Sequence, residues 1–178
     1  MKGVVFTEFN EMVEARFGVV VADNVLAHSR SDGVYTAVGD YDYKELIEMV
    51  VALSKQTETP VEGLVEAFGY HLFGRFAEIY PEFFEGVSEP LDFLEEVEER
   101  IHVQVLKLYP TAALPRFATE RDGNTLHMHY RSPRCLGDLA RGLIRGCLDH
   151  FDRTGTVQDT KATEDGSEVH FTVTLDGH

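Results

Sequence analysis

The chain has 178 residues, 43% of them hydrophobic, a length and composition that suit one domain with a sizeable core. Its 31 acidic residues outnumber the 16 basic ones and give a formal net charge of −15, so the chain repels nucleic acid and anionic membranes at long range. Because no apolar run is long enough to span a bilayer either, we expect neither a nucleic acid nor a membrane as a partner.

The N-terminal segment and the cysteines are typical of a cytoplasmic protein. Glu8, Glu11 and Glu14 interrupt the apolar residues of the first segment, which is unlike a secretory signal. Cys135 and Cys147 are the only cysteines, and on one predicted helix they would be separated by about 18 Å of rise. They could not pair there, so we expect a reduced, cytoplasmic protein.

The first half of the chain is predicted to be helical, because its apolar residues recur with the helical period. Asp40 or Asp42 can cap a helix, Pro60 suits a first helical turn, and Pro81 and Pro110 end helices. The predicted helices cover residues 3–17, 19–28 with a stop near Ser31-Asp32-Gly33, 43–56, 60–79 and 91–109.

After Pro115 the apolar period changes to that of strands. Two extended runs flank Asp122-Gly123-Asn124, which is a hairpin signal, and a second such hairpin surrounds Asp165-Gly166. Between them, the segment CLGDLARGLIRGCLDHF returns to the helical period. The predicted fold class is therefore α+β, with a helical N-terminal half followed by a small antiparallel sheet of two hairpins that one helix interrupts.

His102 lies at the edge of the apolar face of the predicted 91–109 helix, with Glu98 one turn before it. Two interpretations remain open. The helical geometry favours a boundary histidine that is hydrogen-bonded to Glu98; the other is a neutral imidazole that points into a cavity and binds a metal. The central apolar stripe of this helix comprises Leu94, Val97, Ile101, Val105 and Leu108.

The segment HMHYRSPR places Tyr130, Ser132 and Arg134 at two-residue spacing. In an extended segment such residues point to one side, and Pro133 favours that conformation for the residue before it. All three side chains donate hydrogen bonds, and the arginine fork fits a carboxylate or a phosphate. We therefore predict a row of donors that binds an anion.

Other histidines give weaker signals. His127 and His129 lie on one face of a predicted strand and could chelate a metal, but no third ligand is within sequence reach, so a solvated pair is the favoured interpretation. His71 lies among aromatic residues, where we expect a packed core histidine.

Taken together, these residues resemble the H-NOX family, the haem nitric oxide/oxygen binding domains related to the sensor domain of soluble guanylate cyclase. The resemblance rests on the Y-x-S-x-R motif of Tyr130, Ser132 and Arg134, on His102 in an H-x-Q helix upstream of it, and on Pro115. The segments FGRFAEIYPEFF and MKGVVF also match, so the resemblance covers essentially the whole chain.

This resemblance implies a haem b held without covalent attachment, since the C-x-x-C-H signature is absent. Tyr130, Ser132 and Arg134 would hold the two propionates, His102 would be the proximal iron ligand, and Pro115 would press on the macrocycle and distort it. It also implies one haem-binding sensor domain over 1–178, with a distal helical subdomain over 1–60, a proximal subdomain over 61–178, and the haem enclosed between them.

The resemblance also bears on the gas that is bound. In family members that bind oxygen stably, a distal tyrosine donates a hydrogen bond to it, and its place here is Leu139. An apolar wall would therefore favour nitric oxide, with CO also bound, although Tyr70 or His71 could turn toward the haem as another donor. We expect this wall to comprise Val5, Phe76, Leu139 and Leu143.

The function implied is that of a cytoplasmic gas sensor rather than an enzyme. Nitric oxide would weaken the bond from His102 to iron, and the haem would relax against Pro115. No segment resembles a kinase or cyclase, so the partner would be a separate histidine kinase or cyclic-di-GMP enzyme. The alternatives are a metal-dependent enzyme that uses His127 and His129 with nearby carboxylates, and a cofactor-free module whose donor row binds a small carboxylate ligand.

Overall fold

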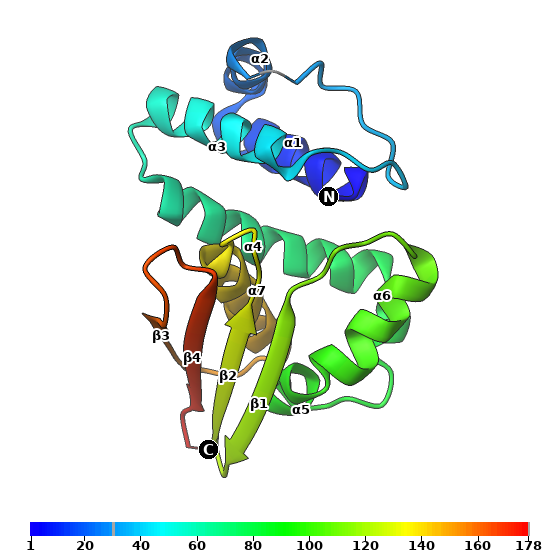
Figure 1. Cartoon of the computed structure of the whole chain (residues 1–178), viewed down its shortest axis with the longest axis vertical. Coiled ribbons are helices and arrows are strands. Elements are labelled where there is room, and N and C mark those ends of the chain that lie inside the picture. Colours follow the sequence, from blue (N-terminus) through cyan, green and yellow to red (C-terminus); the bar gives the residue numbers. More distant parts are fainter. Residues whose placement is uncertain (30, 178) are drawn as a thin grey trace.

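The computed structural model describes residues 1–29 and 31–177 and has a helical lobe above a mixed lobe of helices and sheet (Figure 1). The predicted helices of the N-terminal half are confirmed. Asp42, not Asp40, caps α3, because its Oδ1 accepts a hydrogen bond from the backbone N of Lys44 at 3.0 Å. These helices are α1 (Gly3–Phe17), α2 (Val19–His28), α3 (Tyr43–Thr57) and α4 (Val61–Ile79), the last followed by a short 3₁₀ turn, η1 (Pro81–Phe84).

The single helix predicted over 91–109 is wrong in its middle. The chain forms α5 (Pro90–Glu95), then a π-helical turn, η2 (Val97–Ile101), and then α6 (His102–Leu108). In η2 the backbone N of Ile101 reaches back five residues to the carbonyl O of Glu96 at 3.4 Å. One extra residue in the turn rotates everything after it by about 100°. Leu108, the last residue of α6, is 48% exposed and does not continue the predicted apolar stripe.

The sheet has the order β1-β2-β4-β3, and all of its neighbouring strands are antiparallel. The two predicted hairpins and the helix between them are confirmed, and with them the α+β fold class. Gly123 and Gly166 have positive φ angles of 56° and 74° in the hairpin turns, a conformation that glycine adopts without strain. The elements are β1 (Arg116–Asp122), β2 (Thr125–Arg131), α7 (Gly137–His150), β3 (Gly155–Lys161) and β4 (Glu168–Leu175).

Helices α4 and α7 cross with their backbones in contact. A Cβ atom built on Gly69 would lie 2.3 Å from the carbonyl O of Leu139, and one built on Gly142 would lie 2.0 Å from the carbonyl O of Glu66. The absence of side chains at these two glycines is what allows the close approach. The pair separates two hydrophobic cores, and α4 contributes to both: Leu64, Val65, Phe68 and Leu72 to the N-terminal core and Phe73 to the core on the sheet.

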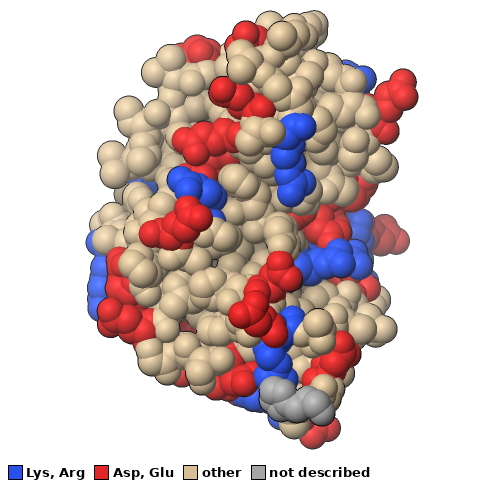
Figure 2. Space-filling model, turned by 180° about the vertical axis from the view of Figure 1, so that it is seen from behind, with Lys and Arg blue, Asp and Glu red and all other residues tan. Residues whose placement is uncertain are grey.

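Two further sequence expectations concern the cysteines and the membrane. Cys135 was expected on the same helix as Cys147, but α7 begins only at Gly137, and Cys135 is exposed with a φ of 55°. Among the described residues, no helix is both long and apolar enough to cross a membrane. Figure 2 shows basic side chains lying among acidic ones on the back face, so the excess acidic charge is spread over that surface.

Candidate functional site

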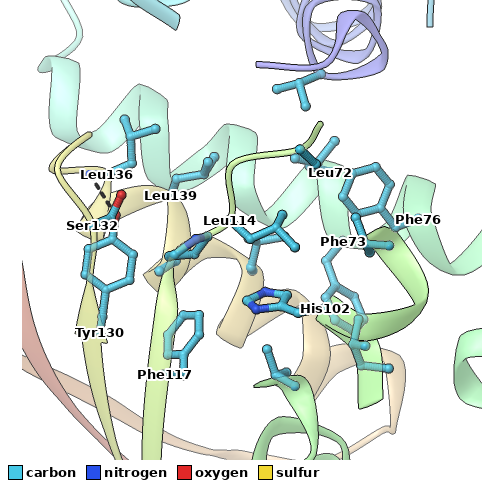
Figure 3. A pocket seen from close by; sticks show the side chains of 18 of the residues that line it. Leu72, Phe73, Phe76, His102, Leu114, Phe117, Tyr130, Ser132, Leu136 and Leu139 are labelled. Carbon is cyan, nitrogen blue, oxygen red and sulfur yellow. Dashed lines mark hydrogen bonds between the residues drawn. The ribbon is translucent and has the colours of Figure 1, made fainter. Parts of the chain in front are cut away.

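A cavity of about 280 Å³ lies where the start of α1, the α4–α7 pair, α6 and the first hairpin meet (Figure 3). Nearly all of its surface is apolar. Its volume is just below the range of about 300–1,000 Å³ that small-molecule pockets occupy. The cavity brings together every residue predicted for the site: Val5, Phe76, His102, Pro115, Tyr130, Ser132, Arg134, Leu139 and Leu143.

His102 combines the two interpretations that the sequence left open. Its Nδ1 lies 3.1 Å from Oε2 of Glu98, and its ring faces the cavity below Leu114 and beside Phe117 (Figure 3). The side chain is 14% exposed. A neutral imidazole that donates its Nδ1 proton to Glu98 keeps the Nε2 lone pair available, which is the form that binds a metal.

The charges around His102 favour this neutral form. Burial lowers the pKa of His102, and this effect outweighs the opposing attraction of Glu98. Burial alone would raise the pKa of Glu98, but hydrogen bonds from Arg116 and from the backbone N of Phe117 hold it below its ordinary value. The result is a neutral imidazole paired with an ionised carboxylate.

The donor row is built differently from the extended segment that we predicted. Strand β2 ends at Arg131, and the backbone N of Cys135 donates to the carbonyl O of Ser132 at 3.2 Å, which closes a turn over 132–135. Pro133 stands second in that turn, a position that its fixed φ suits. Arg134 is therefore in a turn, yet Tyr130, Ser132 and Arg134 still line one cavity.

Hydrogen bonds fix the row while leaving donors free. The hydroxyl of Tyr130 accepts from the backbone N of Leu136 at 3.0 Å, so its own proton remains to be donated (Figure 3). Burial raises the pKa of Tyr130, which keeps the phenol protonated. Arg134 donates through Nη1 to the carbonyl O of Ala113 at 3.0 Å and lies over the ring of Tyr43. Since a guanidinium carries five donors, most of them remain for an anion.

The wall opposite His102 is apolar at the predicted positions. Leu139 and Leu143 come from α7, Phe76 from α4 and Val5 from α1. None of these four side chains can donate a hydrogen bond to a ligand in the cavity.

The two alternative donors point elsewhere. Tyr70 is 40% exposed and donates its hydroxyl proton to Asp149. His71 has its Nε2 3.6 Å from Oε2 of Glu8, and it is partly exposed rather than a core residue as predicted. Neither of these two residues lines the cavity.

Sequence reasoning missed several polar residues of the cavity. Lys2 lines it, and its Nζ lies 2.8 Å from Oδ2 of Asp40 and 2.7 Å from Oγ1 of Thr111. Tyr80 and Tyr109 also line it and join their hydroxyls at 2.5 Å. Each of these contacts joins segments far apart in the sequence, so no local pattern could have indicated them.

The histidines on the sheet lie outside the cavity. His129 has its Nε2 2.8 Å from Oε2 of Glu168 and stacks on His170 with ring centroids 4.2 Å apart, while His127 is exposed. In the part of the chain that the structure describes, no three His, Cys, Asp or Glu residues are arranged to hold a metal ion. The metal-dependent enzyme therefore gains no support.

The cavity suits a largely apolar ligand that carries both a metal and carboxylates. Its apolar surface would bury the body of the ligand, His102 offers one neutral nitrogen to a metal, and the donors of Tyr130, Ser132 and Arg134 can pair with carboxylates. A ligand with charge over its whole surface would lose its hydration without compensation here.

Comparisons with known proteins agree with this geometry. A family model described as haem-NO-binding matches residues 2–159. An H-NOX protein from K. algicida, in an Fe(II) unliganded crystal structure, has a TM-score of 0.94 and 33% identity over 100% of this chain and 98% of that chain. An H-NOX from Shewanella woodyi, in an IWP-051-bound Fe(II)CO state, has a TM-score of 0.83 and 39% identity over 98% and 94%. An H-NOX from S. oneidensis in the Fe(II)NO state has a TM-score of 0.92 and 27% identity over 99% and 100%. No curated protein matches the chain.

Proposed function

This chain belongs to the haem-NO-binding (H-NOX) family of haem-based gas sensors, and from that premise we propose that it binds one b-type haem and senses nitric oxide. The observation that carries the proposal is the cavity itself, in which a neutral histidine and a cluster of carboxylate-binding donors share one apolar space. Like other H-NOX domains, it would act as a sensor module and not as an enzyme.

The polar residues that the sequence predicted for the cavity each have a role in this proposal. His102 would hold the iron through Nε2, and Tyr130, Ser132 and Arg134 would hold the propionates. Arg134 also donates a hydrogen bond to the carbonyl O of Ala113. Pro115 lines the same cavity and would contact the macrocycle. The haem supplies the iron at which a diatomic gas binds.

The signal would be the release of His102 and the relaxation of the wall at Pro115. His102 is the first residue of α6, so its release would loosen the start of that helix, while the hydrogen bond to Glu98 would keep the imidazole in place. These are two states that a partner can distinguish. In this proposal the output would go to a separate cytoplasmic protein, a histidine kinase or a cyclic-di-GMP enzyme.

The apolar wall sets the selectivity. As a ligand of haem, oxygen would depend on a hydrogen-bond donor of the protein far more than nitric oxide or CO would. Leu139 offers none, and Tyr70 and His71 lie outside the cavity. A buried hydrogen bond to a charged group contributes about 1.5–3 kcal/mol, which is about one to two decades in affinity. The absent donor therefore favours nitric oxide and CO over oxygen.

We also propose that residues 1–60 form a distal subdomain and residues 61–178 a proximal one. The two separate hydrophobic cores support this division, and α4 joins them because it contributes to both.

Absorption spectra of the purified ferrous protein, taken in argon, in air, and with CO or nitric oxide, test the function. We expect a coloured protein whose spectrum changes with nitric oxide and with CO but forms no stable oxygen complex in air. A colourless protein that binds no added haem would favour the cofactor-free module.

The variant His102→Gly tests the iron ligand. It should lose haem unless imidazole is added, while His127→Gly, which removes an exposed imidazole from the sheet, should keep it. Full haem and an unchanged spectrum in His102→Gly would show that another residue binds the iron.

A further inference from the structure

Glu98 is the only carboxylate that contacts His102 among the described residues, and it is bound to more than the histidine. Its Oε2 lies 3.1 Å from Nδ1 of His102 and accepts the backbone N–H of Phe117 at 3.1 Å, and its Oε1 accepts from Nη1 of Arg116 at 2.7 Å. One carboxylate thus joins the start of α6 to the start of β1.

The π-helical turn brings this pair into line. Glu98 and His102 are four residues apart. The π-helical turn between them has a hydrogen bond that spans five residues instead of four, so one turn takes more residues than in an α-helix. The two side chains therefore lie more nearly one above the other than they would in an α-helix. A Glu–His pair at this spacing on an exposed helix contributes little. Here the carboxylate is 24% exposed and is fixed by a backbone N–H from another element, so it cannot turn away from the imidazole without losing that bond.

We propose that Glu98 is a positioning residue that sets the strength of the bond from His102 to iron. The inference rests on the proposed function and extends it to the regulation of the same site. A carboxylate that accepts the Nδ1 proton fixes the tautomer and the ring orientation, and it makes Nε2 a stronger electron donor. Glu98 therefore opposes the release of His102 and retains the imidazole beside the cavity once it is released.

Arg116 has the opposite effect. Its guanidinium shares the charge of the carboxylate, which leaves less of that charge to polarise the imidazole. The Arg116 side chain is 81% exposed, so solvent screens its contribution, and we expect it to be smaller than that of Glu98.

The test is the iron–histidine stretching frequency of the ferrous haem protein, measured by resonance Raman spectroscopy. Glu98→Gln keeps the shape of the side chain and removes its charge, so the frequency should fall. Haem transfer to an excess of a haem-scavenging protein should become about 10–100-fold faster, the usual effect of losing such a partner. Glu99→Gln, an exposed carboxylate one residue further on, is the matched control and should change neither quantity.

An unchanged or raised frequency in Glu98→Gln would overturn the inference, because Glu98 would then only link α6 to β1. An equal fall in Glu99→Gln would overturn it too, because the effect would then not depend on the contact with His102. If Glu98→Gln does not fold, Arg116→Ala decides the matter: the frequency should rise, and no rise would overturn the inference. If the unmutated protein shows no iron–histidine band, the assignment of His102 as the ligand has failed, which is a separate result.

Discussion

Replacing Gly142 by alanine tests the backbone contact between α4 and α7. The new Cβ would lie 2.0 Å from the carbonyl O of Glu66 and 2.8 Å from the backbone N of Tyr70. Both neighbours are main-chain atoms inside a helix and cannot rotate away. The two helices must therefore move apart.

The expected loss of stability follows from two opposing effects. Overpacking of this kind destabilises a protein by about 1–3 kcal/mol, and we expect the upper end because rigid backbone is the obstacle. Alanine recovers about 1 kcal/mol through its higher helix propensity. The net loss is then about 2 kcal/mol, or about 4–8 °C in melting temperature for a chain of this length. The haem should also dissociate faster, since the cavity is lined by Phe76 from α4 and by Leu139 from α7.

Urea denaturation and thermal melting followed by circular dichroism measure this effect. Gly74→Ala is the matched control, because Gly74 is an exposed residue of α4 and a Cβ there meets no atom within 4 Å. That variant should be unchanged or more stable by up to about 1 kcal/mol. If Gly142→Ala were as stable as Gly74→Ala, the two helices would not be in backbone contact.

Three further predictions concern the cavity and the thiols. Arg134→Ala should lose haem faster than Ser132→Ala, because arginine can make two charge-assisted bonds and its loss leaves a carboxylate unpaired; equal retention in the two variants would contradict this. Leu139→Tyr should raise oxygen affinity by about one to two decades and change nitric oxide binding little, whereas a stable oxygen complex in the unmutated protein would refute the selectivity argument. A thiol reagent should label Cys135 in the native protein and Cys147 only after unfolding, since Cys147 is 0% exposed and burial raises its pKa. Labelling of both cysteines in the native protein would contradict the fold.

The sequence predicts those parts of the fold that depend on local signals. Proline and cap residues mark the helices of the first half, and the two Asp-Gly turns mark the hairpins. The π-helical turn before His102 is not predicted, because the apolar residues keep the helical period across it. Of the predicted apolar stripe, only Leu108 is exposed in the structure. The turn that contains Arg134 is missed for a similar reason, since Pro133 suits both an extended segment and a turn.

The candidate site could be assembled from the sequence only through a family pattern. Periodicity placed His102 at the edge of an apolar face and Tyr130 beside other donors, but nothing local places both in one cavity. The contacts of Lys2 and Thr111 form only when the two lobes meet, and they fall outside any sequence window.

The sharing of α4 between two cores has a consequence for how the molecule unfolds. If the N-terminal lobe opened by itself, four apolar residues of α4 that are buried in its core would be exposed to water: Leu64, Val65, Phe68 and Leu72. Burying an apolar side chain contributes about 1.5–3 kcal/mol to stability. Separate opening of the N-terminal lobe would therefore cost about 6–12 kcal/mol for these four side chains alone, which is comparable to the total stability of a typical domain. The two lobes should therefore melt in a single cooperative transition. A destabilising substitution in α2 or α3, which contribute no residue to the cavity, would then lower the temperature at which the cofactor is lost.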